Sequence, residues 1–397
     1  MLVLTPAASL VVVAGREPGI STAPHASPVP DWSLRIPALD GLRGIAIFLV
    51  LMRHSIFGME THSKWLSTLL AAGQLTWSGV DLFFVLSGFL IGGILLDARN
   101  SPNYFKTFYI RRAYRIFPLY YALTALFLFR HLPFRILGDL PPLSIPWFSY
   151  LTLTQNFWMA HLGWFGGRGM LVTWSLAIEE QFYLTIPLLI RKLRPERLLW
   201  VLLGVIVGAP LLRTAIYFTM PHGLFTCFAL MPCRADALCL GVLGAYLVRK
   251  PDFWGLLQQR RDLRYLVTGI FSAGIVFMIC RQYDQFSAFM VTFGWTWVAM
   301  FYVCCLLLAV SRDVGILQLA LQNRMLMRLG TLAYCTYLIH IPLSDAGRRI
   351  LSVKFGTNPG TWLAGGLLGV AATLIIASFS WEYFEKPLLR RGHRYHY

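Results

Sequence analysis

The chain has 397 residues, of which 57% are hydrophobic and only 13% are charged, and its mean hydropathy is +0.60. Charged residues make up about a quarter of a typical soluble domain, so this composition excludes an ordinary soluble globule and predicts repeated passage through a lipid bilayer. The formal charge of +17 would suit nucleic acid. The basic residues, however, lie in short loops between apolar runs, so we expect no nucleic-acid partner.

Residues 1–34 are rich in Ala, Ser and Pro and lack the basic start of a signal peptide, so we expect a poorly ordered leader. Residues 35–390 are predicted to form the transmembrane domain, and residues 391–397 a basic tail on the cytoplasmic side. Ten apolar stretches are long enough to cross a bilayer. They cover about 41–58, 77–96, 114–130, 173–190, 198–219, 231–248, 265–281, 288–310, 330–347 and 361–384.

An eleventh stretch, 145–160, is shorter and is interrupted by polar residues. The basic clusters at 191–197 and 249–264 fall on the same side as the amino terminus only if this stretch does not cross. The positive-inside rule therefore favours ten spans, with both termini cytoplasmic and 145–160 re-entrant or interfacial. The expected fold is an all-α, polytopic helical bundle of about ten transmembrane helices in the plasma (inner) membrane.

The first span carries Arg43 and His54, eleven residues apart. On an α-helix this spacing places both side chains on one face, roughly 16 Å apart along the axis. Placing a charged side chain at mid-bilayer costs about 2.5–3.5 kcal/mol of insertion free energy, so a charge within a span indicates a partner or a function. Two interpretations stay open: a snorkelling arginine with an interhelical histidine, or a polar seam across the membrane. The second span carries Asp81 near its outer end, where it is either solvated or part of a site.

Three arginines open the third span at Arg111, Arg112 and Arg115, with aromatic residues between them. Guanidinium groups bind phosphates in forks and stack on rings, so the group suits a phosphorylated, planar ligand; ordinary loop anchoring is the alternative.

The densest intramembrane cluster lies within 173–183. Ser175, Glu179 and Tyr183 follow one another at i, i+4 and i+8, on one helical face. Two adjacent carboxylates, Glu179 and Glu180, are expensive in a membrane unless they have partners.

Two later spans add further polar groups. Arg234 and Asp236 open one span, where we expect them to pair with other helices, and Tyr337 and His340 share a helical face in another. The cysteines lack CxxC spacing and a nearby histidine set, so they are interpreted as packing residues, and no metal site is predicted. They are Cys227, Cys233, Cys239, Cys280, Cys304, Cys305 and Cys335.

Taken in order, these elements resemble the acyltransferase 3 family of integral-membrane acyltransferases over about residues 35–390. The matching segments are 39–44 with Arg43 and His54, 83–90, 111–118, 174–183, 234–238, 337–342 and 384–387. The chain departs from the family at Ala333, where serine is common, and at Thr336, where leucine is common.

The resemblance implies an O-acyltransferase without a tightly bound cofactor, of the stand-alone type that lacks an appended esterase-like domain. It implies acyl-coenzyme A, with acetyl-coenzyme A as the expected form, as co-substrate. The implied acceptor is a hydroxyl of a glycan, a lipid-linked sugar or a polyketide. The oligomeric state is not predicted.

Histidine suits proton removal near neutral pH, so we expect His54 to act as the general base. Arg43 is assigned to the donor phosphates or to the developing oxyanion, and Glu179 to orienting the base or the acceptor. The remaining site residues are assigned to substrate binding: Arg111, Arg112 and Arg115 for the coenzyme A phosphates, with Asp81, Ser175, Tyr183, Arg234, Asp236, Tyr337 and His340. A secondary transporter or flippase for a sugar- or lipid-linked substrate is the alternative function.

Overall fold

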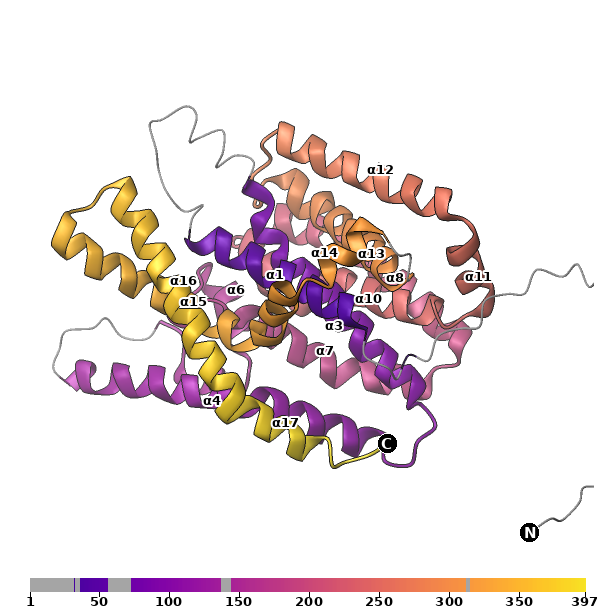
Figure 1. The fold of residues 1–397 in the computed structure, drawn as a ribbon, viewed down its shortest axis with the longest axis horizontal. Helices are drawn as coiled ribbons and strands as arrows, with labels where there is room; N and C mark the ends of the chain where they lie inside the picture. The colour runs from indigo at the N-terminus through magenta and orange to yellow at the C-terminus, as the bar shows by residue number, and fades with distance from the viewer. Residues whose placement is uncertain (1–31, 33–35, 56–72, 137–143, 312–314) are drawn as a thin grey trace, which may run out of the picture.

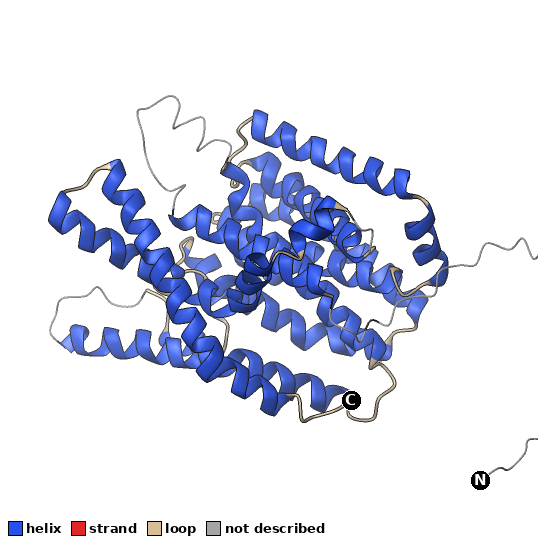
Figure 2. Cartoon of the chain, in the orientation of Figure 1, coloured by secondary structure: helices blue, strands red, loops and turns tan. Residues whose placement is uncertain are grey.

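The computed structural model describes residues 32, 36–55, 73–136, 144–311 and 315–397. Within these ranges the chain forms helices joined by loops, without a strand (Figure 2). The predicted leader, residues 1–34, lies outside the described residues apart from Trp32. The all-α class predicted from the sequence is confirmed.

Over its described residues, each of the ten stretches expected to span the membrane coincides with helix (Figure 1). The elements are α1 (Pro37–Ser55), η1 (Gln74–Ser78), α3 (Gly79–Asp97), α4 (Tyr104–Ile136), α5 (Trp147–Leu151), α6 (Gln155–Leu162), α7 (Thr173–Lys192), α8 (Pro195–Thr219), α9 (Gly223–Ala229), α10 (Met231–Leu247), α11 (Pro251–Gln259), α12 (Arg261–Cys280), η2 (Met290–Gly294), α13 (Trp295–Val310), α14 (Ile316–Leu321), α15 (Arg324–Phe355), α16 (Pro359–Ser380), η3 (Trp381–Glu385) and α17 (Lys386–Gly392).

Among the described residues, six helical segments are long and apolar enough to cross a membrane by themselves. They are Leu75–Asp97, Pro195–Thr219, Gly223–Leu247, Arg261–Cys280, Met290–Val310 and Pro359–Gly392. The other four expected spans, α1, α4, α7 and α15, are long helices that carry more polar residues. The chain is thus a multi-pass helical membrane protein whose most polar helices are those that hold most of the predicted site residues.

The stretch 145–160 does not form one helix. It folds as α5, of five residues, and α6, of eight residues, separated by a break at which Leu153 takes a positive φ of 55°. Neither helix reaches the roughly 20 residues that a span needs. The polar residues that interrupt the stretch dock it inside the bundle, because Gln155 donates to the carbonyl of Thr173 and Asn156 to that of Ala229.

Close helix packing explains why glycines occur in α3 and α15. α3 packs along α10, and α1 packs along α15 (Figure 1). A Cβ atom on Gly88 would collide with the backbone carbonyl of Leu238, and one on Gly330 with that of Asp40. Small residues let membrane helices approach to backbone contact, which holds α1 and α3 at the centre of the bundle.

The carboxyl-terminal helix returns to α4. α16 continues through one π-helical turn, η3, into α17, and α17 lies beside α4 (Figure 1). The tail that follows also contacts α4, where Thr107 donates to the carbonyl of His396 at 2.8 Å.

Candidate active site

A first group of predicted residues meets where α1, α4 and α7 converge. We call Arg43, Arg112, Arg115, Glu179 and Tyr183 the arginine cluster. The Tyr183 hydroxyl donates to Glu179 Oε2 at 3.3 Å, and the Arg112 guanidinium lies 5.8 Å from the centre of the Tyr183 ring. The charges of all three arginines act on the Glu179 carboxyl. Helices far apart in sequence therefore bring three cations within electrostatic range of one carboxylate.

The arginine cluster is balanced by further carboxylates. Arg43 Nη1 lies 3.5 Å from Asp40 Oδ1, and the charge of Glu385 acts on Arg115. Glu385 belongs to η3, where its Oε1 accepts a hydrogen bond from Ser380 at 2.9 Å. The Arg43 side chain retains 29% of its exposure although it lies on a helix in the centre of the bundle. Nearby carboxylates thus stabilise Arg43 and Arg115, while the Arg43 side chain stays partly exposed.

A second group forms a pair of histidines. His340 Nε2 lies 3.1 Å from His54 Nδ1, and the two ring centres are 4.9 Å apart. His54 Nδ1 is also 3.0 Å from the carbonyl oxygen of Val50, and His340 Nδ1 is 2.8 Å from that of Tyr337. Arg348 Nη2 donates to the carbonyl of His54 at 2.7 Å. α15 therefore fixes both the ring and the backbone of His54.

Tyr337 links the two groups. Its hydroxyl oxygen lies 2.6 Å from Ser175 Oγ and is acted on by the charge of Glu179. Tyr337 stands one helical turn before His340 on α15, and Ser175 one turn before Glu179 on α7. We call the whole arrangement, from the arginine cluster through Tyr337 to the histidine pair, the polar seam. It combines a titratable imidazole at one end with several cations at the other.

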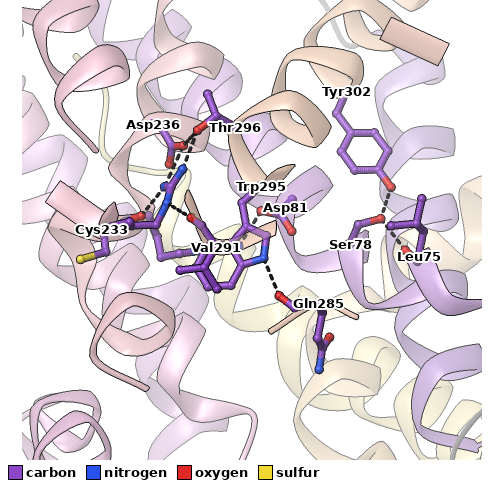
Figure 3. A network of polar contacts seen from close by, with 12 residues as sticks. Leu75, Ser78, Asp81, Cys233, Asp236, Gln285, Val291, Trp295, Thr296 and Tyr302 are labelled. Atoms are coloured by element: carbon purple, nitrogen blue, oxygen red, sulfur yellow. Dashed lines mark hydrogen bonds and ion pairs between the residues drawn. The ribbon is translucent and has the colours of Figure 1, made fainter. Parts of the chain in front are cut away.

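The structure places Asp81, Arg234 and Asp236 elsewhere, in a buried ion network that also includes Arg213 and Thr296 (Figure 3). Arg234 Nη2 donates to Asp81 Oδ1 at 2.5 Å, and Arg213 Nη1 to Asp236 Oδ2 at 3.0 Å. Asp81 is 1% exposed, so the interpretation of Asp81 as a solvated helix end is wrong.

The ion network joins four helices into one unit. Arg213 of α8 also donates to Thr296 of α13 at 2.6 Å, and the Arg234 guanidinium of α10 stacks over the Trp295 ring at 4.3 Å. Arg234 and Asp236 were expected to pair with other helices, and the structure shows both pairs. Arg213 and Thr296 were missed, although a lone charge inside the apolar stretch 198–219 was a signal for a buried partner.

Arg111 turns away from Arg112 and Arg115, the other two arginines that open α4. Its Nε donates to the carbonyl of Tyr395 at 2.9 Å, and its guanidinium lies 5.1 Å from the centre of the Tyr397 ring. Arg112 and Arg115 thus belong to the polar seam, whereas Arg111 contacts the carboxyl-terminal tail.

Comparison with known proteins adds to this geometry. Residues 36–381 match the family model described as an acyltransferase domain. The chain is 29% identical to the peptidoglycan O-acetyltransferase OatA of Listeria monocytogenes, with 90% of the chain and 56% of that protein covered. It is 28% identical to the putative peptidoglycan O-acetyltransferase YrhL of Bacillus subtilis, with 90% and 56% covered. The O-acetyltransferase OatA of Staphylococcus aureus is 24% identical, with 90% and 58% covered.

The chain thus spans little more than half the length of these relatives. No solved structure matches it. The family model extends over most of the chain, from the start of α1 into η3, and it contains every residue of the polar seam. The chain therefore belongs to the acyltransferase 3 family, as the order of its motifs predicted.

Proposed function

We propose that this protein is a membrane O-acyltransferase that moves an acyl group from acyl-coenzyme A to a hydroxyl of a glycan, with His54 as the general base. The polar seam is the observation that carries the proposal. It joins cations suited to a phosphorylated donor with an imidazole suited to proton removal. The relatives support the glycan, because two of the three are named as acting on peptidoglycan.

In the proposed reaction the acceptor hydroxyl lies beside His54. The hydroxyl oxygen attacks the thioester carbonyl carbon while the His54 imidazole takes the hydroxyl proton. The carbon–sulfur bond then breaks, and the thiolate leaves with the proton that His54 returns. The products are the ester and free coenzyme A, so neither an oxidant nor a reductant is needed.

The geometry favours one of the two roles expected for Arg43. An oxyanion donor must lie about 2.7–3.1 Å from the reacting oxygen. Arg43 and His54 are roughly 16 Å apart along α1, and Arg43 shares the arginine cluster with Arg112 and Glu179. We therefore assign Arg43, together with Arg112 and Arg115, to the phosphates of the donor. Glu179 is assigned to holding these arginines and Tyr183 in position.

The two ends of the polar seam suit the expected orientation. The positive-inside rule predicts that α4 starts on the cytoplasmic side, where acyl-coenzyme A is made. The arginine cluster would then face the donor, and the histidine pair would lie toward the other side, where a cell-wall glycan is found. In this arrangement the acyl group crosses part of the membrane along the seam.

The test is ester-linked acetate on peptidoglycan isolated from cells that express the full chain, released by mild alkali and compared with cells that carry an empty vector. We expect the wild type and a control, His161→Gln, to raise the acetate equally, because His161 is exposed on α6. His54→Gln should give vector levels while the protein still accumulates in the membrane. Wild-type acetate with His54→Gln would overturn the assignment of the base, and movement of a glycan without ester formation would favour a transporter.

A further inference from the structure

We infer that His340 is a positioning residue for the acyl transfer: it is the neutral hydrogen-bond acceptor that sets the tautomer of His54 and stabilises the imidazolium that His54 becomes. The inference rests on the proposed function of His54. It replaces the expectation from sequence that His340 contacts a substrate.

The hydrogen bonds assign the protons of both rings. His340 Nδ1 faces the carbonyl oxygen of Tyr337 at 2.8 Å, and a carbonyl only accepts, so Nδ1 of His340 carries a proton. In the neutral ring its Nε2 is then an acceptor. His54 Nδ1 faces that Nε2 at 3.1 Å and the Val50 carbonyl at 3.0 Å. Because both of these neighbours accept, His54 Nδ1 must also carry a proton.

This assignment leaves one nitrogen free for chemistry. With Nδ1 protonated, the lone pair of a neutral His54 lies on Nε2, which is therefore the atom that removes the acceptor proton. In the opposite case His340 Nε2 would carry the proton and donate to an unprotonated His54 Nδ1. That nitrogen would then lie 3.0 Å from the Val50 carbonyl oxygen with no proton between them, and this contact between two acceptors disfavours the arrangement.

The same bond changes in strength during the reaction. When His54 Nε2 has taken the proton, the ring is a cation and Nδ1–H becomes a charged donor to His340 Nε2. Hydrogen bonds to charged groups are stronger than neutral ones, so the contact gains most when charge develops on His54. His340 is fully buried, and its Nδ1–H is held by Tyr337. His340 thus acts as the third group of a general-base system does: it orients the base and stabilises its charged form.

Two variants separate this role from simple packing. His340→Gln places an amide oxygen near the position of Nε2, where it accepts from His54, whereas His340→Leu fills space without an acceptor. Transfer is measured on the purified full chain with acetyl-coenzyme A and soluble peptidoglycan fragments, and in cells by alkali-released acetate. We expect His340→Leu to lower kcat about tenfold to a hundredfold with little change in either KM. His340→Gln should retain most of the kcat.

The alternatives give different results. If His340 only fills space, the apolar leucine is tolerated at least as well as the buried amide, and a kcat for His340→Leu equal to or above that for His340→Gln would overturn the inference. If His54 is not the base, His54→Gln stays active, and the proposed function fails first. If His54→Gln is inactive while His340→Leu is fully active, the inference about His340 is rejected and the proposed role of His54 stands.

Discussion

Arg213 and Asp236 form an ion pair with 0% and 4% side-chain exposure, at the point where α8, α10 and α13 meet. Because neither charge reaches water, each depends on the other, and Thr296 completes the shell of the carboxylate with a 2.6 Å hydrogen bond. The pair, like the Asp81–Arg234 pair beside it, is therefore a structural requirement of the bundle.

Replacing Asp236 with Asn should destabilise the protein by about 3–5 kcal/mol, because the change leaves the Arg213 charge buried without a counter-ion. Asp97→Asn is the matched control: its ion pair with Arg249 is shorter, at 2.6 Å against 3.0 Å, but Asp97 is 47% exposed. Exposed pairs contribute about 0–1 kcal/mol. Thermal unfolding of both variants in detergent measures the difference, and equal losses would contradict a special role for the buried pair.

Replacing Arg112 or Arg115 with Gln should raise the KM for acetyl-coenzyme A about tenfold to a hundredfold, as expected for the loss of a charged hydrogen bond. The acceptor KM and the kcat should change little, because a contact shared by ground and transition states affects binding only. Arg194→Gln, an exposed position after α7, is the control for general loss of basic charge. An unchanged donor KM in both variants would remove the phosphate role.

Arg111→Gln should have a smaller effect on the donor KM than Arg112→Gln. Arg111 is committed to the tail through Tyr395 and Tyr397, whereas Arg112 lies over Tyr183 in the arginine cluster. Steady-state kinetics on equal amounts of membrane-inserted protein compares the two. A larger rise in the donor KM for Arg111→Gln than for Arg112→Gln would place the donor site at the surface that faces the tail and not in the polar seam.

The orientation predicted from loop charges places residue 194 in the cytoplasm and Cys280, the exposed last residue of α12, on the opposite side. A membrane-impermeant maleimide added to intact cells should therefore label wild-type Cys280. In a second protein, Arg194→Cys is combined with Cys280→Ser. We expect the maleimide to label this protein only after the cells are opened. Labelling of position 194 from outside would show that the span count or the orientation is wrong.

A Cβ atom on Gly88 meets the backbone of α10, so Gly88→Ala should separate α3 from α10 and lower stability by about 1–3 kcal/mol. Gly204→Ala in α8 is the control, because nothing lies within 4 Å of its added Cβ. Alanine is the better helix former by up to about 1 kcal/mol, so the control should be neutral or slightly stabilised. Thermal unfolding of the two variants measures both effects, and comparable losses would show that close approach at Gly88 is unimportant.

Much of the architecture was predictable because hydrophobicity dictates it locally. Length and apolarity identified the helices. Loop charge predicted that 145–160 does not span, and the structure divides this stretch into the short helices α5 and α6. Helical spacing placed Ser175, Glu179 and Tyr183 on one face. These inferences need only neighbours in the sequence.

The pairing of distant residues was not predictable in the same way. Asp81 meets Arg234 across 153 positions, and nothing in either local sequence specifies the other. Arg213 is the one charged residue within 198–219, which signals a buried partner, but the span itself does not specify which helix supplies that partner. Arg111 was grouped with Arg112 by adjacency, yet neighbours on a helix point about 100° apart, and the structure separates them.

The histidine pair has a consequence for biogenesis. His54 and His340 are 286 positions apart, so the ribosome needs roughly 15–60 s to make the second after the first, at about 5–20 residues per second. During that interval α1 has left the ribosome without α15, its main packing partner, and its polar face has no permanent neighbour. The first of the described helices is thus among the last to complete its packing, and the base is assembled only once α15 has entered the membrane.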